Sequence, residues 1–245
     1  MKVITRSLIA TAVGALLPLG LIAAPAQAAS VTDRFYRETV AYGAKDTDQH
    51  HIAHVRELQY RLRWAGVYGG SVNGSFNSTV RTAVKKYQKK VGLPQTGVVN
   101  QATWARLLQA TVRGWSRVPK ACRASGWHAC YDRTLHQVLL FHNNVTVNTW
   151  LVRGGSSALP TRTGNFAVKS RDIDHVSSIY DSSMPFAQFF NGGQALHGSV
   201  LMMNPFVGHS HGCVNFYLED AQQLWKLTAG LPKGALKVHV YGAWN

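Results

Sequence analysis

Residues 55–108 read VRELQYRLRWAGVYGGSVNGSFNSTVRTAVKKYQKKVGLPQTGVVNQATWARLL, and their apolar spacing predicts a helical N-terminal half. Apolar residues recur every three or four positions in three separate runs, which is the spacing of one buried helix face. Gly66 and Gly92 are typical stops after the first two runs, and Ser78 and Asn100 are typical caps before the last two. Helices this short are unstable alone in water, so the pattern predicts a three-helix bundle with one shared core.

The composition of the whole chain argues against intrinsic disorder, and its first residues indicate export. The 245 residues are 46% apolar, which is enough to form a sizeable core. Lys2 and Arg6 precede an apolar run over residues 8–24, and Ala26-Gln27-Ala28 supplies a small-x-small cleavage pattern. A membrane anchor is the competing interpretation, but the run is short and interrupted by prolines. We therefore expect residues 1–28 to be a signal peptide and the product to be secreted, extracellular or cell-wall associated, without a transmembrane segment.

The helical segment is strongly basic. Between Val55 and Ala110 nine basic residues face one acid, Glu57, a net charge of +8 out of +15 for the whole chain. The basic residues are Arg56, Arg61, Arg63, Arg81, Lys85, Lys86, Lys89, Lys90 and Arg106. A face charged only for solubility normally mixes both signs, so the excess favours an anionic extracellular polymer as partner. Nucleic acid is not expected, because export removes access to it and no nucleic-acid motif interrupts the run.

The chain divides into parts of different periodicity. Residues 29–50 show no clear period, and the pattern assigns them no structure. Residues 51–112 form the helical domain and residues 113–120 the expected linker. Over residues 121–245, short runs rich in β-branched and aromatic residues predict a mainly β domain with one helix near residues 218–228. The expected fold class is therefore multidomain, α followed by mainly β.

The expected export determines how the three cysteines are interpreted. Disulfides persist in oxidising compartments, and Cys122 and Cys130 are close enough in sequence to close a small loop. Two reduced thiols are the alternative. Cys213 is left over, and an unpaired cysteine in a secreted protein is either an intermolecular partner or a reactive thiol.

The chemical signal lies in residues 196–216, LHGSVLMMNPFVGHSHGCVNF. A cysteine is a good nucleophile only as thiolate, and a nearby imidazole promotes that form by taking or balancing the proton. Cys213 has His197 and His211 as candidates. Gly212 permits close backbone approach, and consecutive amides beside the nucleophile are suited to a developing oxyanion. The pattern favours an acyl-transfer site.

Two other interpretations of Cys213 remain open from the residues alone. His209, His211 and Cys213 alternate, so on an extended strand they share a face and, with His197, supply four zinc ligands. No closed structural-zinc spacing accompanies them. The other alternative is a buried inert thiol, since free cysteine is usually buried.

The helical segment resembles the peptidoglycan-binding family of three-helix wall-targeting modules. The matching positions are Leu58-Gln59, Leu62, Gly66, Gly74, Phe76, Thr79, Ala83-Val84, Tyr87-Gln88, Gly92-Leu93, Thr96-Gly97-Val98 and Thr103-Trp104. Most are core and turn positions. Wall binding is what the resemblance implies, and the helical period itself does not show it.

The second half is similar to the L,D-transpeptidase (YkuD-like) catalytic domain. The similarity rests on HG at His197-Gly198, on SHGCVN at residues 210–215 and on LPTRTGNFAV at residues 159–168. It implies a β-sandwich-like domain and an acyltransferase that needs no metal or cofactor. It also implies that Cys213 attacks a tetrapeptide stem of peptidoglycan, expels D-Ala and passes the acyl group to a second stem as a 3→3 crosslink.

The resemblance also implies roles for individual residues. Cys213 matches the nucleophile and His197 the base that pairs with it. The remaining positions match the loop that shapes or supports the oxyanion site: His211, Gly212, Ser210, Asn215 and Gly198. Some family members carry a serine directly after the base, where this chain has Gly198, so the partner that orients His197 is either a backbone carbonyl or Ser199.

Two alternatives to crosslinking have the same residues. If water replaces the amine as acceptor, the protein is an L,D-carboxypeptidase. If the β domain is catalytically inactive, the protein only binds the wall. The choice of acceptor depends on loop shape and water exclusion, which sequence does not give.

Overall fold

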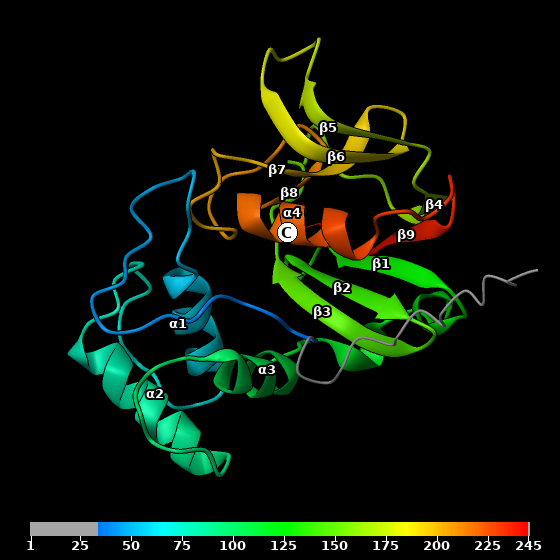
Figure 1. Ribbon diagram of the computed structural model, residues 1–245. Coiled ribbons are helices and arrows are strands. Elements are labelled where there is room, and N and C mark those ends of the chain that lie inside the picture. Colours follow the sequence, from blue (N-terminus) through cyan, green and yellow to red (C-terminus); the bar gives the residue numbers. More distant parts are fainter. Residues whose placement is uncertain (1–33, 245) are drawn as a thin grey trace, which may run out of the picture.

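The computed structural model describes residues 34–244, which form a helical domain beside a larger β domain (Figure 1). The predicted signal peptide, residues 1–28, lies outside the described residues. Within residues 34–244, no helix combines the length and apolar character required to cross a bilayer.

The three predicted helices are present: α1 spans Val55–Trp64, α2 Ser78–Lys90 and α3 Gln101–Ala110. Each buries one apolar face in a shared core, and Leu58, Val84 and Trp104 are fully buried there. The cap of α2 is Asn77, whose Oδ1 accepts from the Val80 amide at 3.1 Å, so the prediction of Ser78 was wrong by one residue. Asn100 caps α3 as predicted.

Residues 34–50, the described part of the segment 29–50 that had no predicted structure, contact both domains. Val40 pairs with Val99 in a short bridge, and Phe35 and Val40 are buried in the core of the helices. The Phe35 amide also donates to the Val147 carbonyl of the β domain at 3.0 Å. Pairing between distant segments orders this stretch, which explains why it has no local period.

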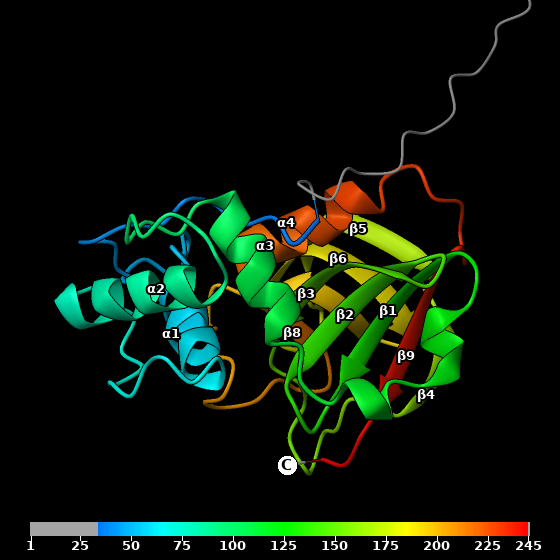
Figure 2. The same ribbon diagram turned by 90° about the horizontal axis from the view of Figure 1, so that it is seen from below.

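The β domain consists of two sheets, as the sandwich-like expectation requires. Its strands are β1 (Trp127–Asp132), β2 (Gln137–His142), β3 (Val145–Leu151), β4 (Gly164–Ala167), β5 (Ser170–Val176), β6 (Ser183–Asn191), β7 (Gln194–Gly198), β8 (Val214–Phe216) and β9 (Leu236–Tyr241). One sheet has the order β3-β2-β1-β9-β4 and the other β5-β6-β7-β8. Figure 2 shows the first sheet from its outer side.

One helix and a disulfide complete the β domain. Helix α4 spans Leu218–Leu227, as predicted, and packs against β6, β7 and β8. Its Ala221 and Leu224 join the core that both sheets share. The predicted disulfide between Cys122 and Cys130 is present and ties the short helix η2 (Lys120–Arg123) to β1.

A buried group of charges joins the two domains. Arg37 Nε lies 2.8 Å from Glu57 of α1 and 3.6 Å from Asp220 of α4. Glu57 also pairs with Arg61 at 2.7 Å, and His54 lies 3.1 Å from Asp220. Burial alone would raise the pKa of Glu57, but the two arginines lower it to about 2. Arg61, counted above among the cations of a basic surface, is therefore a fully buried partner of Glu57.

Glu57→Gln tests this junction. The substitution keeps the shape of the side chain but removes the charge that Arg37 and Arg61 share, and unpaired buried charges are costly. We expect the free energy of unfolding in urea to fall by about 3 to 5 kcal/mol. The same change at exposed Glu38 is the control and should have little effect; an equally small loss at Glu57 would contradict the stabilising role of the network.

Candidate active site

The parallel pairing of β7 with β8 brings the predicted site residues together. His197 is in register with Asn215, and Leu196 with Val214. Side chains alternate between the two faces of a strand, and residues in register share a face. His197 and Asn215 are thus neighbours, and Cys213, two residues before Asn215, is directed to the same face.

The sulfur of Cys213 is held by the backbone that leads into β7. The Ala195 amide donates to Sγ at 3.4 Å, and Sγ lies 3.6 Å from the Gly193 carbonyl, to which a thiol donates. Burial raises the pKa of Cys213 and outweighs the opposing hydrogen bond from Ala195. The group is therefore a protonated thiol at neutral pH.

His197 is buried and oriented by a backbone carbonyl. Its Nδ1 lies 2.7 Å from the Gly198 carbonyl oxygen, which fixes the proton on Nδ1 and leaves Nε2 as an acceptor. Ser199, the other candidate partner, uses its hydroxyl to accept from the Leu201 amide. Burial lowers the pKa of His197 to about 4, against the opposing effect of the Gly198 hydrogen bond.

These shifts make the resting pair neutral. A thiolate–imidazolium pair requires a low cysteine pKa and a high histidine pKa, and burial moves both in the opposite direction. In this arrangement the imidazole is suited to accept the thiol proton as the sulfur attacks, which is general-base chemistry.

Ser210 stabilises the turn that carries Cys213. Its Oγ donates to the Cys213 carbonyl at 2.6 Å and accepts from the Gly212 amide at 3.1 Å. Its own amide donates to the Gly154 carbonyl at 2.8 Å. Thr161 adds a longer bond to the same Cys213 carbonyl, at 3.5 Å, a role that the sequence reasoning did not assign to it.

Gly212 is required by the shape of this turn. Its φ is +119°, and a Cβ at this position would lie 2.7 Å from Gln194 Nε2. Gln194 has no room to move, because its amide group bonds the Pro160 carbonyl and the Arg162 amide. Sequence reasoning missed Gln194, since nothing in its neighbourhood along the chain marks it as a support of the motif.

The amides around the sulfur differ in availability. The Gly212 amide already donates to Ser210, which argues against Gly212 as a direct oxyanion donor. Within residues 34–244, the amides of His211 and Cys213 have no acceptor. These two amides are the better candidates for stabilising negative charge beside the nucleophile.

The histidines of the motif do not converge on Cys213. The exposed ring of His211 stacks on Tyr180, with ring centroids 4.2 Å apart, and His209 Nδ1 lies 3.3 Å from the Ser210 carbonyl oxygen. Among the described residues, three potential ligands come together only at Cys122 with Cys130 and His239, where the two sulfurs form the disulfide, and at His54 with Glu57 and Asp220, which belong to the buried group of charges. Neither group includes Cys213, and the zinc interpretation of the motif has no geometric support.

Residues 199–209, here called the connecting loop, link His197 to the cysteine turn and pack against the helical domain. Tyr60 Oη donates to Asn204 at 3.2 Å, and the rings of Tyr60 and Phe206 are 4.7 Å apart. Trp64 meets Phe206 edge-on at 6.2 Å. The helical domain therefore supports one side of the site, which the sequence did not indicate.

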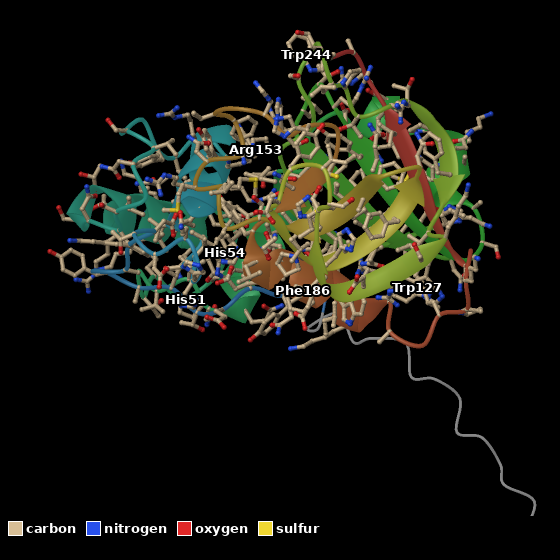
Figure 3. The ribbon with its side chains drawn as sticks, turned by 90° about the horizontal axis from the view of Figure 1, so that it is seen from above. His51, His54, Trp127, Arg153, Phe186 and Trp244 are labelled. Carbon is tan, nitrogen blue, oxygen red and sulfur yellow. A yellow bond between two sulfur atoms is a disulfide. The ribbon has the colours of Figure 1, made fainter. Side chains whose placement is uncertain are left out.

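Arg153 supports the connecting loop from the other side. It lies near the boundary between the helical domain and the strands (Figure 3). Its guanidinium donates to the carbonyls of Val207 and Leu201 at 3.2 and 3.3 Å. The only signal of this residue in the sequence is its place at the carboxyl end of a predicted strand.

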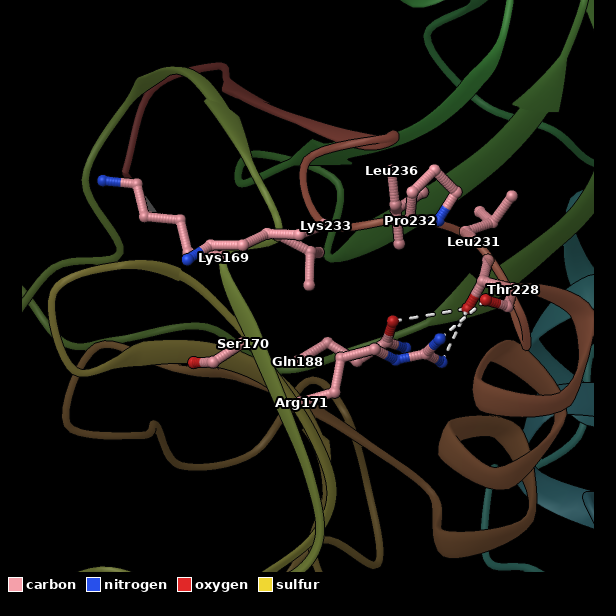
Figure 4. A pocket seen from close by; sticks show the side chains of 10 residues that line it. Lys169, Ser170, Arg171, Gln188, Thr228, Leu231, Pro232, Lys233 and Leu236 are labelled. Atoms are coloured by element: carbon pink, nitrogen blue, oxygen red, sulfur yellow. Dashed lines mark hydrogen bonds between the residues drawn. The ribbon is translucent and has the colours of Figure 1, made fainter.

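A separate small cavity of about 170 Å³ lies beside the end of α4 (Figure 4). Arg171 donates there to the Thr228 carbonyl at 2.6 Å and to the Trp225 carbonyl at 3.0 Å. A cation bound to the last carbonyls of a helix stabilises that end. Neither Cys213 nor His197 lines this cavity, so Arg171 is a structural arginine.

Comparison with known proteins gives the class of each domain. Residues 53–107 match the peptidoglycan binding domain family, and residues 127–240 match the L,D-transpeptidase catalytic domain family, YkuD. The L,D-transpeptidase structure from Stackebrandtia nassauensis is 23% identical, covers 86% of this chain and 98% of its own, and has a TM-score of 0.52. An L,D-transpeptidase from Xylanimonas cellulosilytica is 25% identical, covers 84% and 98%, and has a TM-score of 0.49.

A curated relative matches a smaller part of this chain. The spore cortex-lytic enzyme of Bacillus cereus is 33% identical over 97 residues, or 40% of this chain. The chain spans about a third of that relative, 35% of its length.

The chain therefore carries a peptidoglycan-binding domain followed by an L,D-transpeptidase catalytic domain of the YkuD family. The catalytic-domain match supports a peptidoglycan-modifying enzyme, and both matches suggest a cell-wall or extracellular location.

The neutral pair predicts how Cys213 reacts with iodoacetamide. Cys213 is the only cysteine outside the disulfide. Below its raised pKa, the thiolate fraction grows about tenfold per pH unit, so the alkylation rate should climb from pH 6 to beyond 9 without a plateau. His197→Ala should leave this profile unchanged. A plateau beginning near pH 5 in the wild type, lost in His197→Ala, would reveal a thiolate–imidazolium pair and contradict the assignment.

Proposed function

We propose that the protein is an exported, cysteine-dependent L,D-transpeptidase that makes 3→3 crosslinks in peptidoglycan. Two observations support the proposal. The register of β7 with β8 sets His197 beside Asn215, two residues after Cys213, and the hydrogen bond of Nδ1 to the Gly198 carbonyl leaves Nε2 of His197 without the proton. The catalytic-domain match supplies the reaction class.

In the first half-reaction, Cys213 attacks the carbonyl of the third stem residue at its L-centre. Its thiol proton passes to Nε2 of His197 as the C–S bond forms, and the amides of His211 and Cys213 stabilise the oxyanion. Collapse of this intermediate breaks the C–N bond, and His197 returns the proton to the departing D-Ala amine. A thioester on Cys213 remains.

In the second half-reaction, the amine of a neighbouring stem attacks the thioester. His197 takes a proton from the attacking amine, the C–S bond breaks, and the sulfur recovers a proton as the new amide forms. Electrons and protons balance with no cofactor. His197 thus acts alternately as base and acid, and for this Nε2 must be unprotonated at the start.

The helical domain is proposed to hold the enzyme on the wall. Arg61 is buried and does not contribute to the surface charge. The exposed cations gather on α2, where Arg81, Lys86, Lys89 and Lys90 face solvent. A one-sign surface of this kind suits an anionic wall polymer. The disulfide supports export, since disulfides persist in oxidising compartments.

The reaction is tested by weighing products. Purified protein incubated with disaccharide-tetrapeptide should release D-Ala and yield a crosslinked dimer, and Cys213→Ala should yield neither while keeping the fold. Tripeptide without dimer would instead establish an L,D-carboxypeptidase. Unchanged substrate with the wild type would leave a wall-binding protein and contradict the proposal.

His197→Ala tests the base. Loss of a positioned general base should lower the rate of thioester formation by about 10² to 10⁴-fold, as followed by intact-protein mass. His211→Ala is the matched control and should cost far less, because the exposed His211 ring stacks on Tyr180. The reverse order of effects would transfer the role of base to His211.

A further inference from the structure

Arg153 is a buried cation without an anionic partner. Only 9% of its surface is exposed, and the other arginines buried to this degree, Arg37 and Arg61, both pair with Glu57. No carboxylate of residues 34–244 lies within ion-pair distance of Arg153. Burying an unpaired charge is unfavourable, and such a charge is well suited to a ligand that completes the pair.

Most of its hydrogen-bonding capacity is unused. A guanidinium has five N–H donors in a fork that matches a carboxylate. One donor of Nη1 and one of Nη2 bind loop carbonyls at 3.2 and 3.3 Å, and Nε is buried without an acceptor. Three donors of Arg153 are therefore available.

The strand pairing directs Arg153 to the face of the site. Arg153 and Asn215 exchange two backbone hydrogen bonds, at 3.0 and 2.8 Å, as an antiparallel pair. Asn215 is in turn in register with His197. The three side chains form a row on the face to which Cys213 is directed, and Asn215 Oδ1 also lacks a partner.

We propose that Arg153 binds the terminal carboxylate of the donor stem peptide and so determines specificity for a free C-terminal residue. The inference rests on the proposed function. When the scissile carbonyl lies at Cys213 and the leaving nitrogen at His197, the carboxylate of the departing residue is two bonds beyond that nitrogen. Arg153 is the cation of this row and lies across Asn215 from His197.

The experiment compares a tetrapeptide stem ending in a carboxylate with the same stem ending in a carboxamide. The readout is kcat/KM for D-Ala or D-alaninamide release. A charge-assisted hydrogen bond gives the wild type a preference for the acid of about 10 to 100-fold. Arg153→Gln should lower kcat/KM on the acid substrate more than on the amide, so that the acid-to-amide ratio falls toward one. Arg153→Lys, which keeps the charge, should retain part of the preference.

Arg171→Gln is the matched control, because Arg171 also binds backbone carbonyls but lies at the end of α4. It should leave the acid-to-amide ratio unchanged. Equal losses on both substrates in Arg153→Gln would mean that Arg153 only supports the connecting loop, and would overturn the inference. Release from neither substrate by the wild type would instead overturn the proposed function, and the inference with it.

Discussion

The site depends on the parallel pairing of two short strands, β7 and β8. Their register fixes His197 beside Asn215 and directs Cys213 to the same face, although the motif residues are separated by the connecting loop. A slip of one residue would send one of the two side chains to the opposite face. The turn that ends in Cys213 must therefore be rigid, and Ser210 and Gly212 make it so.

The same burial that assembles the pair keeps it neutral. Removing imidazole and thiol from water disfavours their charged forms, so the pKa of His197 is lowered and that of Cys213 is raised. A neutral thiol is also less readily oxidised than a thiolate. The helical domain packs on the connecting loop through Tyr60 and Trp64, so it supports the site in addition to matching the peptidoglycan binding domain family.

The sequence pattern predicted the features that depend on residues close together along the chain. The helical period predicted α1 to α3, and the motif around Cys213 gave the candidate site residues, whose roles stay predictions. Contacts between segments far apart in the sequence could not be predicted from it. Arg153 and Gln194 act through such contacts, which the spacing of residues along the chain does not indicate. The prediction that Arg61 belongs to the basic surface was wrong, because its charge was counted without its partner. Glu57, one helical turn earlier, already indicated an ion pair with Arg61.

An NMR titration of the His197 ring nitrogens in the free enzyme measures directly whether the resting pair is neutral. The neutral pair predicts a midpoint at about pH 4 and, at pH 7, a proton on Nδ1 with Nε2 bare. The same midpoint should persist in Cys213→Ala. A midpoint at or above 6.5 that falls when Cys213 is removed would show that the imidazolium is stabilised by a thiolate, and would contradict the account.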